Sequence, residues 1–243
     1  GMDMRRAAVT GRNFEYYSED GVLSGHMASN TVNGMAAKDV YAYIKHFVMN
    51  EQETNRCSLL LTYSDEQAIR EIYLKPFEIS VKGFDGKSLA VMSSFNFIGD
   101  RWTGANANLL NHVLRDEWGF RGMVLTDWNG SYGYQNTEDA VRNGNDAMLG
   151  FFSAESNQIT NTSPTMVLAM RQACKNILYT VSNSGNYTVP DPNADKMPNM
   201  TKLFITIDSA VAAASLGIMA LVLARYFKKR KKVTVEVVPK EEK

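Results

Sequence analysis

The sequence predicts an α/β fold of repeated strand–helix units, followed by one helix that is suited to cross a membrane. Short apolar runs typical of buried strands begin near residues 41, 89, 122 and 146, and amphipathic stretches lie between them. Strand starts about 25–50 residues apart suit βα units that build a parallel sheet. The membrane helix is indicated by a long apolar run near the C-terminus, which five consecutive basic residues follow at once.

Two of these strand–helix units are predicted in the first half of the chain. Residues 1–25 are expected to hold the end of one strand and the long loop after it. The next strand is predicted at Tyr41–Phe47, a run rich in β-branched and aromatic residues. A helix is predicted at Ser64–Val81, where Ser64 and Gln67 have the spacing of a capping box and Pro76 should kink or end the regular part.

The second half continues the same alternation of strands and helices. Strands are predicted at Leu89–Phe95, Met123–Leu125 and Asp146–Leu149. Helices are predicted at Asn106–Glu117, Thr137–Arg142 and Met166–Val181. Gly119 fits the position just beyond the first of these helices, where a left-handed backbone is common. Residues 1–185 are therefore expected to form one α/β domain.

The C-terminal part predicts a linker, a membrane span and a basic tail. Residues 186–202 read as a linker, because Asn, Ser, Gly, Pro and Asp replace apolar periodicity there. Residues 203–227 are long enough to cross a bilayer with some tilt, and Ser209 to Ala224 carry no charge. By the positive-inside rule, the tail 228–243 lies in the cytoplasm and the preceding body outside the cell membrane. A buried, Ala-rich core helix is the alternative for the apolar run.

Charge and metal-ligand spacing exclude two classes of function. Residues 1–202 hold 18 basic and 22 acidic residues, whereas residues 228–243 hold seven basic and three acidic ones. A mildly acidic body with a basic tail argues against nucleic acid as a partner. The histidines and cysteines form no metal-type cluster, so no metal or cofactor is expected. Cys57 and Cys174 are expected to be free, buried thiols.

Asp127 is a candidate catalytic residue because of its position at the end of a predicted strand. It follows a short buried strand, and the C-terminal strand ends of parallel barrels form the active face. An Asp after a strand is also a common turn former or helix cap, which is the alternative that position alone favours.

Five motifs, spread in order over residues 1–185, change that balance. They are "GRNFEYYSED" at 11–20, "IKHFVMNEQE" at 44–53, "AVMSSFN" at 90–96, "WGFRGMVLTDW" at 118–128 and "GNDAML" at 144–149. Together they resemble, in the same order, the motifs of glycoside hydrolase family three, the β-glucosidase-type enzymes. The resemblance implies a (β/α)8 barrel, of which this chain would carry about the last five strands, and no cofactor.

The resemblance also implies roles for single residues. Asp127 matches the family's catalytic nucleophile. Arg12, Lys45 and His46 match residues that bind the sugar ring, and Trp128 and Phe95 are expected to contact the substrate as well. The family usually has a Tyr where this chain has Phe95, so one hydroxyl near the nucleophile is missing.

The implied whole enzyme is larger than this chain. In most of the family the acid/base residue is a Glu on a separate α/β domain, and this domain and the first barrel strands are not in the chain. We therefore expect the C-terminal part of a membrane-anchored, exo-acting, retaining β-glycosidase, inactive as the isolated chain. The alternatives are a catalytically incomplete surface protein that at most binds carbohydrate, and a truncated reading frame.

Overall fold

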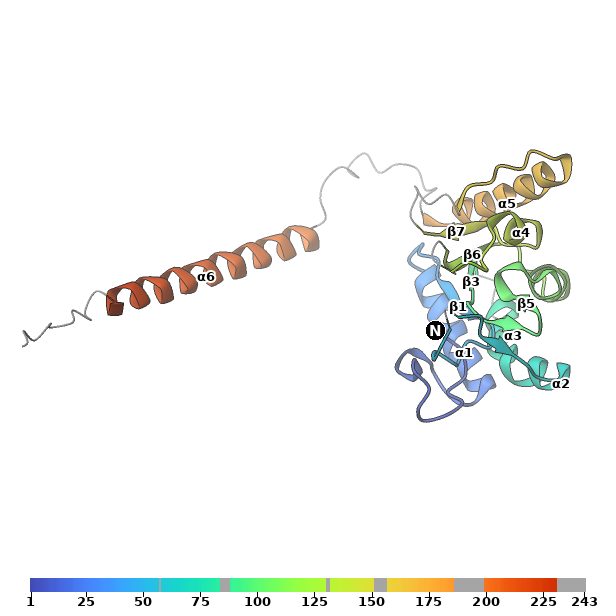
Figure 1. Ribbon diagram of the computed structural model, residues 1–243, viewed down its shortest axis with the longest axis horizontal. Coiled ribbons are helices and arrows are strands. Elements are labelled where there is room, and N and C mark those ends of the chain that lie inside the picture. The colour runs from blue at the N-terminus through green and yellow to red at the C-terminus, as the bar shows by residue number, and fades with distance from the viewer. Residues whose placement is uncertain (57, 84–87, 130–131, 151–156, 186–198, 231–243) are drawn as a thin grey trace, which may run out of the picture. The chain divides into compact units, whose positions relative to one another are not determined.

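The computed structural model describes residues 1–56, 58–83, 88–129, 132–150, 157–185 and 199–230, and the chain divides into two compact units. Unit 1 spans Gly1–Thr188 and unit 2 spans Val189–Lys243. Figure 1 shows the elements of each unit along the chain. The predicted site residues all fall in unit 1, so the two units are described separately.

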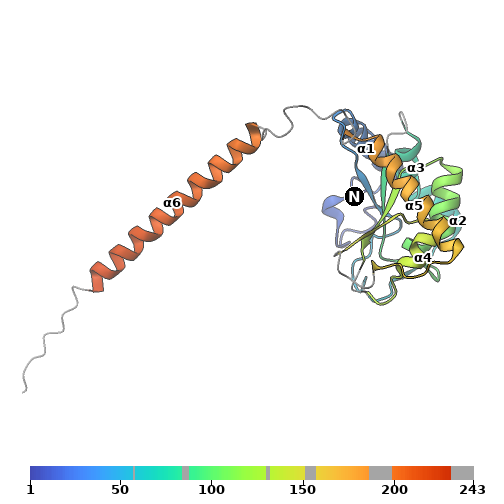
Figure 2. The ribbon, with the colours of Figure 1, turned by 90° about the horizontal axis from the view of Figure 1, so that it is seen from above.

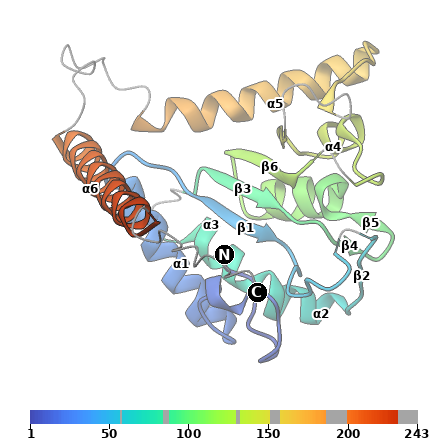
Figure 3. The same ribbon diagram turned by 60° about the vertical axis from the view of Figure 1, so that its left-hand side comes forward.

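Unit 1 is built on a parallel four-stranded sheet in the order β1-β3-β6-β7, whose strands are labelled in Figure 1. Figure 3 shows β1, β3 and β6 side by side. The strands are β1 (Tyr43–Phe47), β3 (Ala90–Ser93), β6 (Met123–Trp128) and β7 (Ala147–Leu149). All four predicted strands are present, and each pairs in parallel with its neighbours.

The predicted number of about five barrel strands is one too high for the described residues. The expected strand end near residue 1 is not an assigned strand. Residues 2–4 nevertheless lie beside β1, because the Met2 N–H donates to the Lys45 carbonyl oxygen at 2.7 Å. The segment is too irregular to continue the ladder, since the Met4 N–H turns to the side chain of Glu51 at 3.4 Å instead.

Helix α1 (Gly21–Ala36) corrects the prediction of a loop that reaches residue 25. Its N-cap is Asp20, whose side chain accepts the Val22 and Leu23 N–H groups. The helix has poor intrinsic propensity, with three glycines and several Ser, Thr and Asn residues. Packing against the helix after β1 compensates, and Gly25 allows close approach because a Cβ there would lie 2.7 Å from Ile79.

The helical region after β1 has three parts: α2 (Glu66–Ala68), the π-helical η2 (Ile69–Tyr73) and α3 (Lys75–Lys82). The predicted capping box is wrong, because Asp65 rather than Ser64 is the N-cap and accepts the Ala68 N–H at 2.8 Å. Pro76 lies in the first turn of α3, where its missing N–H costs nothing. The predicted break near Pro76 is therefore confirmed.

The later helices follow the predicted order. They are η5 (Asn108–Glu117), also π-helical, α4 (Thr137–Arg142) and α5 (Pro164–Ser182). Gly119 has φ +74° after η5, as its predicted position requires. Helix α5 packs on α4 and β6 (Figure 2). Cys174, on α5, is a free thiol as expected, but it is exposed rather than buried, and Cys57 lies outside the described residues.

Short elements that the sequence did not reveal complete unit 1. A second sheet has the order β2-β4-β5, with β4 antiparallel to β5. Its strands are β2 (Leu61–Thr62), β4 (Phe97–Ile98) and β5 (Arg101–Trp102), and the 3-10 turns are η1 (Asn13–Glu15) and η4 (Thr103–Ala105). Runs of two residues carry no periodicity from which a strand can be predicted.

The core lies between the parallel sheet and its helices. Phe47, Val91 and Val124, from three neighbouring strands, are fully buried. The Phe47 ring packs edge-to-face on Phe77 of α3 at 5.1 Å and on Trp118 at 5.9 Å. This apolar packing fixes the middle of the strands, so the polar residues at their carboxyl ends are held on a rigid support.

Unit 2 contains one described element, α6 (Asn199–Arg230). Within it, Met200–Lys228 is long and apolar enough to cross a membrane, by length and composition only. Its large apolar side chains are exposed. Most of the predicted linker and tail, residues 186–198 and 231–243, lies outside the described residues.

Candidate functional site

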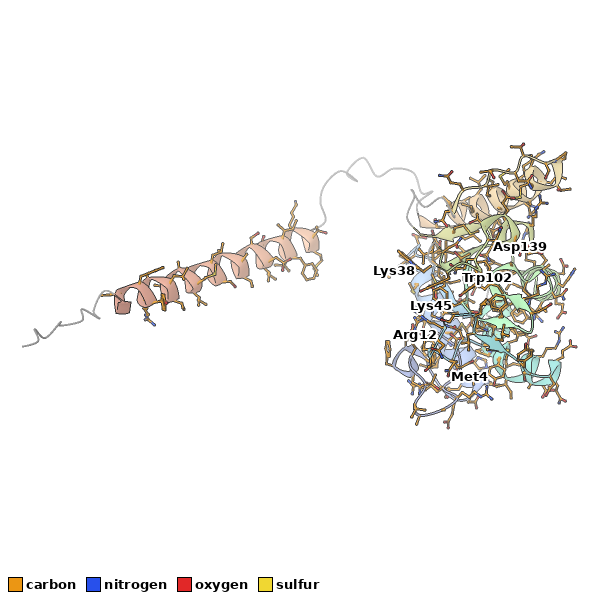
Figure 4. All side chains as sticks on the ribbon, viewed as in Figure 1. Met4, Arg12, Lys38, Lys45, Trp102 and Asp139 are labelled. Carbon is orange, nitrogen blue, oxygen red and sulfur yellow. The ribbon has the colours of Figure 1, made fainter. Side chains whose placement is uncertain are left out.

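The predicted site residues come from the carboxyl ends of neighbouring parallel strands and from the N-terminal loop. Lys45 and His46 lie in β1, and Asp127 and Trp128 end β6. Phe95 follows the last residue of β3 by two positions. Arg12, immediately before η1, lies on the same side of the unit as Lys45 (Figure 4).

Asp127 lies against the imidazole of His46. The Asp127 Oδ2 atom is 3.4 Å from His46 Nε2, and Asp127 Oδ1 accepts the Trp128 N–H at 3.1 Å. The Asp127 side chain is 14 % exposed, so it is sheltered but reachable. Burial raises the pKa of Asp127, and the nearby positive charges act in the opposite direction. They belong to Arg56, Arg12 and Lys45, and to His46 when its imidazole is protonated.

Glu15 joins two of the predicted sugar-binding cations. Its Oε1 atom accepts a hydrogen bond from Arg12 Nε, and its Oε2 atom lies 3.0 Å from Lys45 Nζ. Burial alone would raise the pKa of Glu15, but the hydrogen bonds from Lys45 and Arg12 lower it. Glu15 therefore stays charged and fixes the directions of the two cations. It lies in the first of the five motifs, yet nothing in its spacing marked it as a site residue.

Arg56 is a further cation that the sequence did not reveal. Its guanidinium lies over the Phe95 ring, 4.7 Å from the centroid, and its Nη1 atom is 2.9 Å from Glu53 Oε2. Glu53 is also 3.7 Å from Arg12 Nη1. Arg56 thus links the loop after β1 to the end of β3. Its position, three residues beyond the second motif, gave no local signal.

His46 is enclosed rather than open to solvent. It is 1 % exposed, and its two ring nitrogens each lie 3.4 Å from a carboxylate, Nδ1 from Asp3 and Nε2 from Asp127. Asp3 is equally buried and was not among the predicted residues. The expected hydrogen bond from His46 to a sugar stays a prediction.

The two predicted aromatic contacts differ in exposure. Trp128 is 36 % exposed, so its ring is accessible beside Asp127. Phe95 is buried, between Arg56 and the Tyr132 ring at 5.2 Å. Phe95 therefore supports the wall of the site, whereas Trp128 presents a surface on which a sugar could stack.

The arrangement suits chemistry on a neutral, hydroxyl-rich substrate. A carboxylate at a strand end is faced by three cationic side chains and one imidazole. Fixed Arg and Lys donors match vicinal hydroxyls. Among the described residues, no group of three or more His, Cys, Asp and Glu side chains could hold a metal ion.

Comparison with known proteins identifies the family. Residues 2–181 match the model of the glycosyl hydrolase family 3 N terminal domain. Beta-glucosidase B of Emericella nidulans is 34 % identical over 214 residues, which is 85 % of this chain and 25 % of the relative. A beta-glucosidase of Ruminococcus albus is 43 % identical over 128 residues, 53 % of this chain and 13 % of the relative.

Solved structures give the same result for the fold. Beta-glucosidase 3B of Thermotoga neapolitana, in complex with glucose, has a TM-score of 0.65 and 38 % identity over 76 % of this chain and 27 % of that chain. The GH3 beta-glucosidase of Bifidobacterium adolescentis has a TM-score of 0.68 and 30 % identity over 79 % of this chain and 28 % of that chain. The chain thus spans between 13 % and 28 % of the length of these relatives. It belongs to glycosyl hydrolase family 3.

Proposed function

We propose that this chain is the barrel portion of a retaining β-glycosidase that removes single sugars from β-glucosides or related substrates. The observation that carries the proposal is the position of Asp127 at the end of β6, faced by His46, Arg12, Lys45 and Arg56. The names of the relatives, which are beta-glucosidases, support the substrate class.

In this mechanism Asp127 attacks the anomeric carbon and displaces the leaving group. A glycosyl ester forms on its carboxylate, and water then hydrolyses it. Nucleophilic attack needs an ionised Asp127. Burial opposes ionisation, so the four cationic or ionisable neighbours are the groups that maintain the charge.

The remaining residues bind and orient the sugar. Lys45 and Arg12, held apart by their shared partner Glu15, present donors to neighbouring hydroxyls. Trp128 offers an apolar face beside the nucleophile. The second carboxyl that a retaining enzyme needs, about 5–5.5 Å from the nucleophile, is supplied from outside this chain in the proposal.

A trapping experiment tests the nucleophile. The complete gene product that contains this chain is incubated with a 2-fluoro-glucoside, which reacts with retaining nucleophiles and leaves slowly. Mass spectrometry then locates the label. We expect the label on Asp127 and none in an Asp127→Asn variant. Absence of label on folded wild-type protein would move the function to the alternative, a surface protein that binds carbohydrate without hydrolysing it.

We further propose that α6 anchors the enzyme in the cell membrane, with the barrel outside and the C-terminus in the cytoplasm. The support is the length and apolar composition of Met200–Lys228 and the five cations at 228–232. The exposure of its apolar side chains in unit 2 agrees with a lipid environment.

Thiol labelling of intact cells tests this orientation. Cys174 is exposed on α5, so a membrane-impermeant maleimide should label it without permeabilisation. All variants carry Cys57→Ser, because Cys57 lies outside the described residues, and Cys174→Ser is the matched control for the labelled site. In a Val238→Cys variant on that background, labelling should need permeabilised cells. Labelling of this introduced tail thiol in intact cells, or release of the protein by alkaline carbonate, would refute the anchor.

A further inference from the structure

Two buried carboxyl groups beneath the site have no part in the proposed function so far. Asp3 is 1 % exposed and Glu51 is 7 % exposed. The Asp3 carboxylate accepts two backbone hydrogen bonds, from the His46 N–H to Oδ2 at 2.8 Å and from the Asn50 N–H to Oδ1 at 3.2 Å. One side chain therefore holds both ends of residues 46–50, the segment in which β1 ends.

Asp3 also faces the imidazole that touches the nucleophile. The Asp3 Oδ2 atom lies 3.4 Å from His46 Nδ1, and His46 Nε2 lies 3.4 Å from Asp127 Oδ2. His46 therefore lies between the carboxylates of Asp3 and Asp127, and it is almost fully buried. Nδ1 has no hydrogen-bond partner among the described residues, so its contact with Asp3 is one of charge. Two carboxylates on opposite sides of one ring favour the imidazolium over the neutral imidazole.

We propose that Asp3 is a positioning residue of this site, which acts through His46 and holds its imidazole as the cation that keeps Asp127 ionised. The inference rests on the proposed function, because it matters only if Asp127 is the nucleophile. The geometry assigns two tasks to Asp3. It orients the His46 ring through the backbone of residues 46–50, and its charge is the counterpart of the imidazolium.

Glu51 is the second buried carboxyl group, and it lies close to Asp3. The Met4 N–H donates to Glu51 Oε1 at 3.4 Å. Burial first, and then the charge of Asp3, raise the pKa of Glu51 to about 8, against the backbone hydrogen bonds and Arg6. Glu51 therefore remains protonated at neutral pH, so it adds no second negative charge beside Asp3.

Several titratable and charged groups of unit 1 surround Asp3, Glu51 and Asp127. Asp3 is faced by His46 and Tyr16, and Glu51 is faced by Asp3, Arg6 and Tyr73. Asp127 is faced by His46, Arg56, Arg12, Lys45 and Glu53. Within the described chain, Asp3 is the carboxylate that lies against the Nδ1 side of His46.

The test is the pH dependence of fluoro-glucoside labelling in the complete gene product. We compare the wild type with Asp3→Asn, which keeps the size and one acceptor of the side chain but not its charge. Without the charge, the imidazolium is less favoured and Asp127 needs a higher pH to ionise. We expect the acid limb of the labelling rate to move to higher pH by about one unit, which corresponds to tenfold in the ionisation equilibrium. Asp65→Asn, at the exposed cap of α2, is the control and should leave the profile unchanged.

Each other outcome of this comparison contradicts the proposal. A rate reduced by the same factor at every pH means that Asp3 only supports the fold. An acid limb at lower pH means that the Asp3→Asn substitution acts by removing a negative charge near Asp127. An unchanged profile means that Asp3 has no role in the site.

A second measurement does not depend on activity, so it separates this proposal from the proposed function. The ring ¹⁵N signals of His46 are assigned as those that a His46→Gln variant of the complete gene product lacks. We expect both His46 ring nitrogens to be protonated in the wild type and one of them to lose its proton in Asp3→Asn at the same pH. Identical signals in both proteins would overturn the role of Asp3, even if Asp127 is labelled. Failure of labelling with the expected His46 signals would count against the proposed function alone.

Discussion

At the scale of single residues, the cationic side chains of the site are held by carboxylates that each contact two of them. Glu15 is held between Arg12 and Lys45, and Glu53 between Arg12 and Arg56. The motifs identified Arg12 and Lys45 because these residues match a family pattern. The carboxylates that orient them were not predicted, since a sequence does not reveal which acid reaches which base across a loop. The same is true of Asp3, which lies 43 residues before its partner His46.

Glu15→Gln should weaken the site without unfolding the protein. A neutral amide cannot accept two charge-assisted hydrogen bonds, each worth about 1.5–3 kcal/mol. Arg12 and Lys45 would then lose their fixed directions. We expect the labelling rate of Asp127 to fall about 10- to 100-fold. Glu19→Gln, the same change at an exposed position of the same loop, is the control. Equal rates in the two variants would show that Glu15 does not organise the cations.

The buried carboxyl of Glu51 predicts how stability varies with pH. Its pKa is raised from the ordinary value of 4.5 to about 8, chiefly by burial. An acid with a raised folded-state pKa stabilises the fold below its unfolded pKa, and the contribution disappears as pH rises through the folded value. Between pH 5 and 8 the free energy of unfolding should therefore fall by an amount on the order of a few kcal/mol.

Glu51→Gln isolates this effect because its side chain cannot ionise. We expect the melting temperature of the variant to fall less than that of the wild type between pH 5 and pH 9, so the difference between the two curves should grow with pH. Thermal unfolding followed by circular dichroism in detergent gives both curves. Parallel curves would mean that Glu51 titrates at an ordinary pKa.

At the scale of elements, the strands and helices were predicted where apolar periodicity decides the structure. The strands contain short apolar runs that are easy to recognise, and residues such as Val91 and Val124 in them are fully buried. Helix α1 was missed because its glycines and small polar residues have low helix propensity, and contacts with α3 outweigh that deficit. The capping box at Ser64 was wrong by one residue because the neighbouring Asp65 is an equally good cap, and its side chain accepts the Ala68 N–H.

Gly119, after η5, gives a quantitative test of the predicted helix end. It has φ +74°, and no atom lies within 4 Å of the position that a methyl group would take, so substitution by Ala costs only backbone strain. That cost is about 1 kcal/mol. Gly119→Ala should lower the free energy of unfolding by this amount, measured by urea denaturation in detergent. Gly133→Ala, which also meets no neighbour but has no positive φ, is the matched control. Equal effects of the two variants would show that the backbone at Gly119 is not constrained.

At the scale of the whole molecule, the family and its motifs were recognised from the sequence, but the extent of the barrel was not. The described sheet ends at β1 and β7, and the chain covers about a quarter of its relatives. The membrane anchor stays a proposal at this scale, because helix length and composition alone do not establish a lipid environment.

The open sheet predicts the behaviour of unit 1 by itself. An outer strand presents unpaired backbone groups that favour association with another chain. Residues 1–188, without the apolar helix, contain the predicted nucleophile and sugar-binding residues but no second carboxyl assigned to acid catalysis. We therefore expect this fragment to aggregate, and its soluble fraction to hydrolyse an aryl β-glucoside at least a thousandfold more slowly than the complete gene product, within the range that loss of acid–base catalysis gives. Size-exclusion chromatography and a chromogenic assay measure the two properties. A monomeric fragment with turnover similar to that of the complete protein would mean that unit 1 contains both catalytic groups. The acid/base residue would then be one of the carboxylates of unit 1. Glu53 would be the first to test, because its charge interacts with that of Asp127.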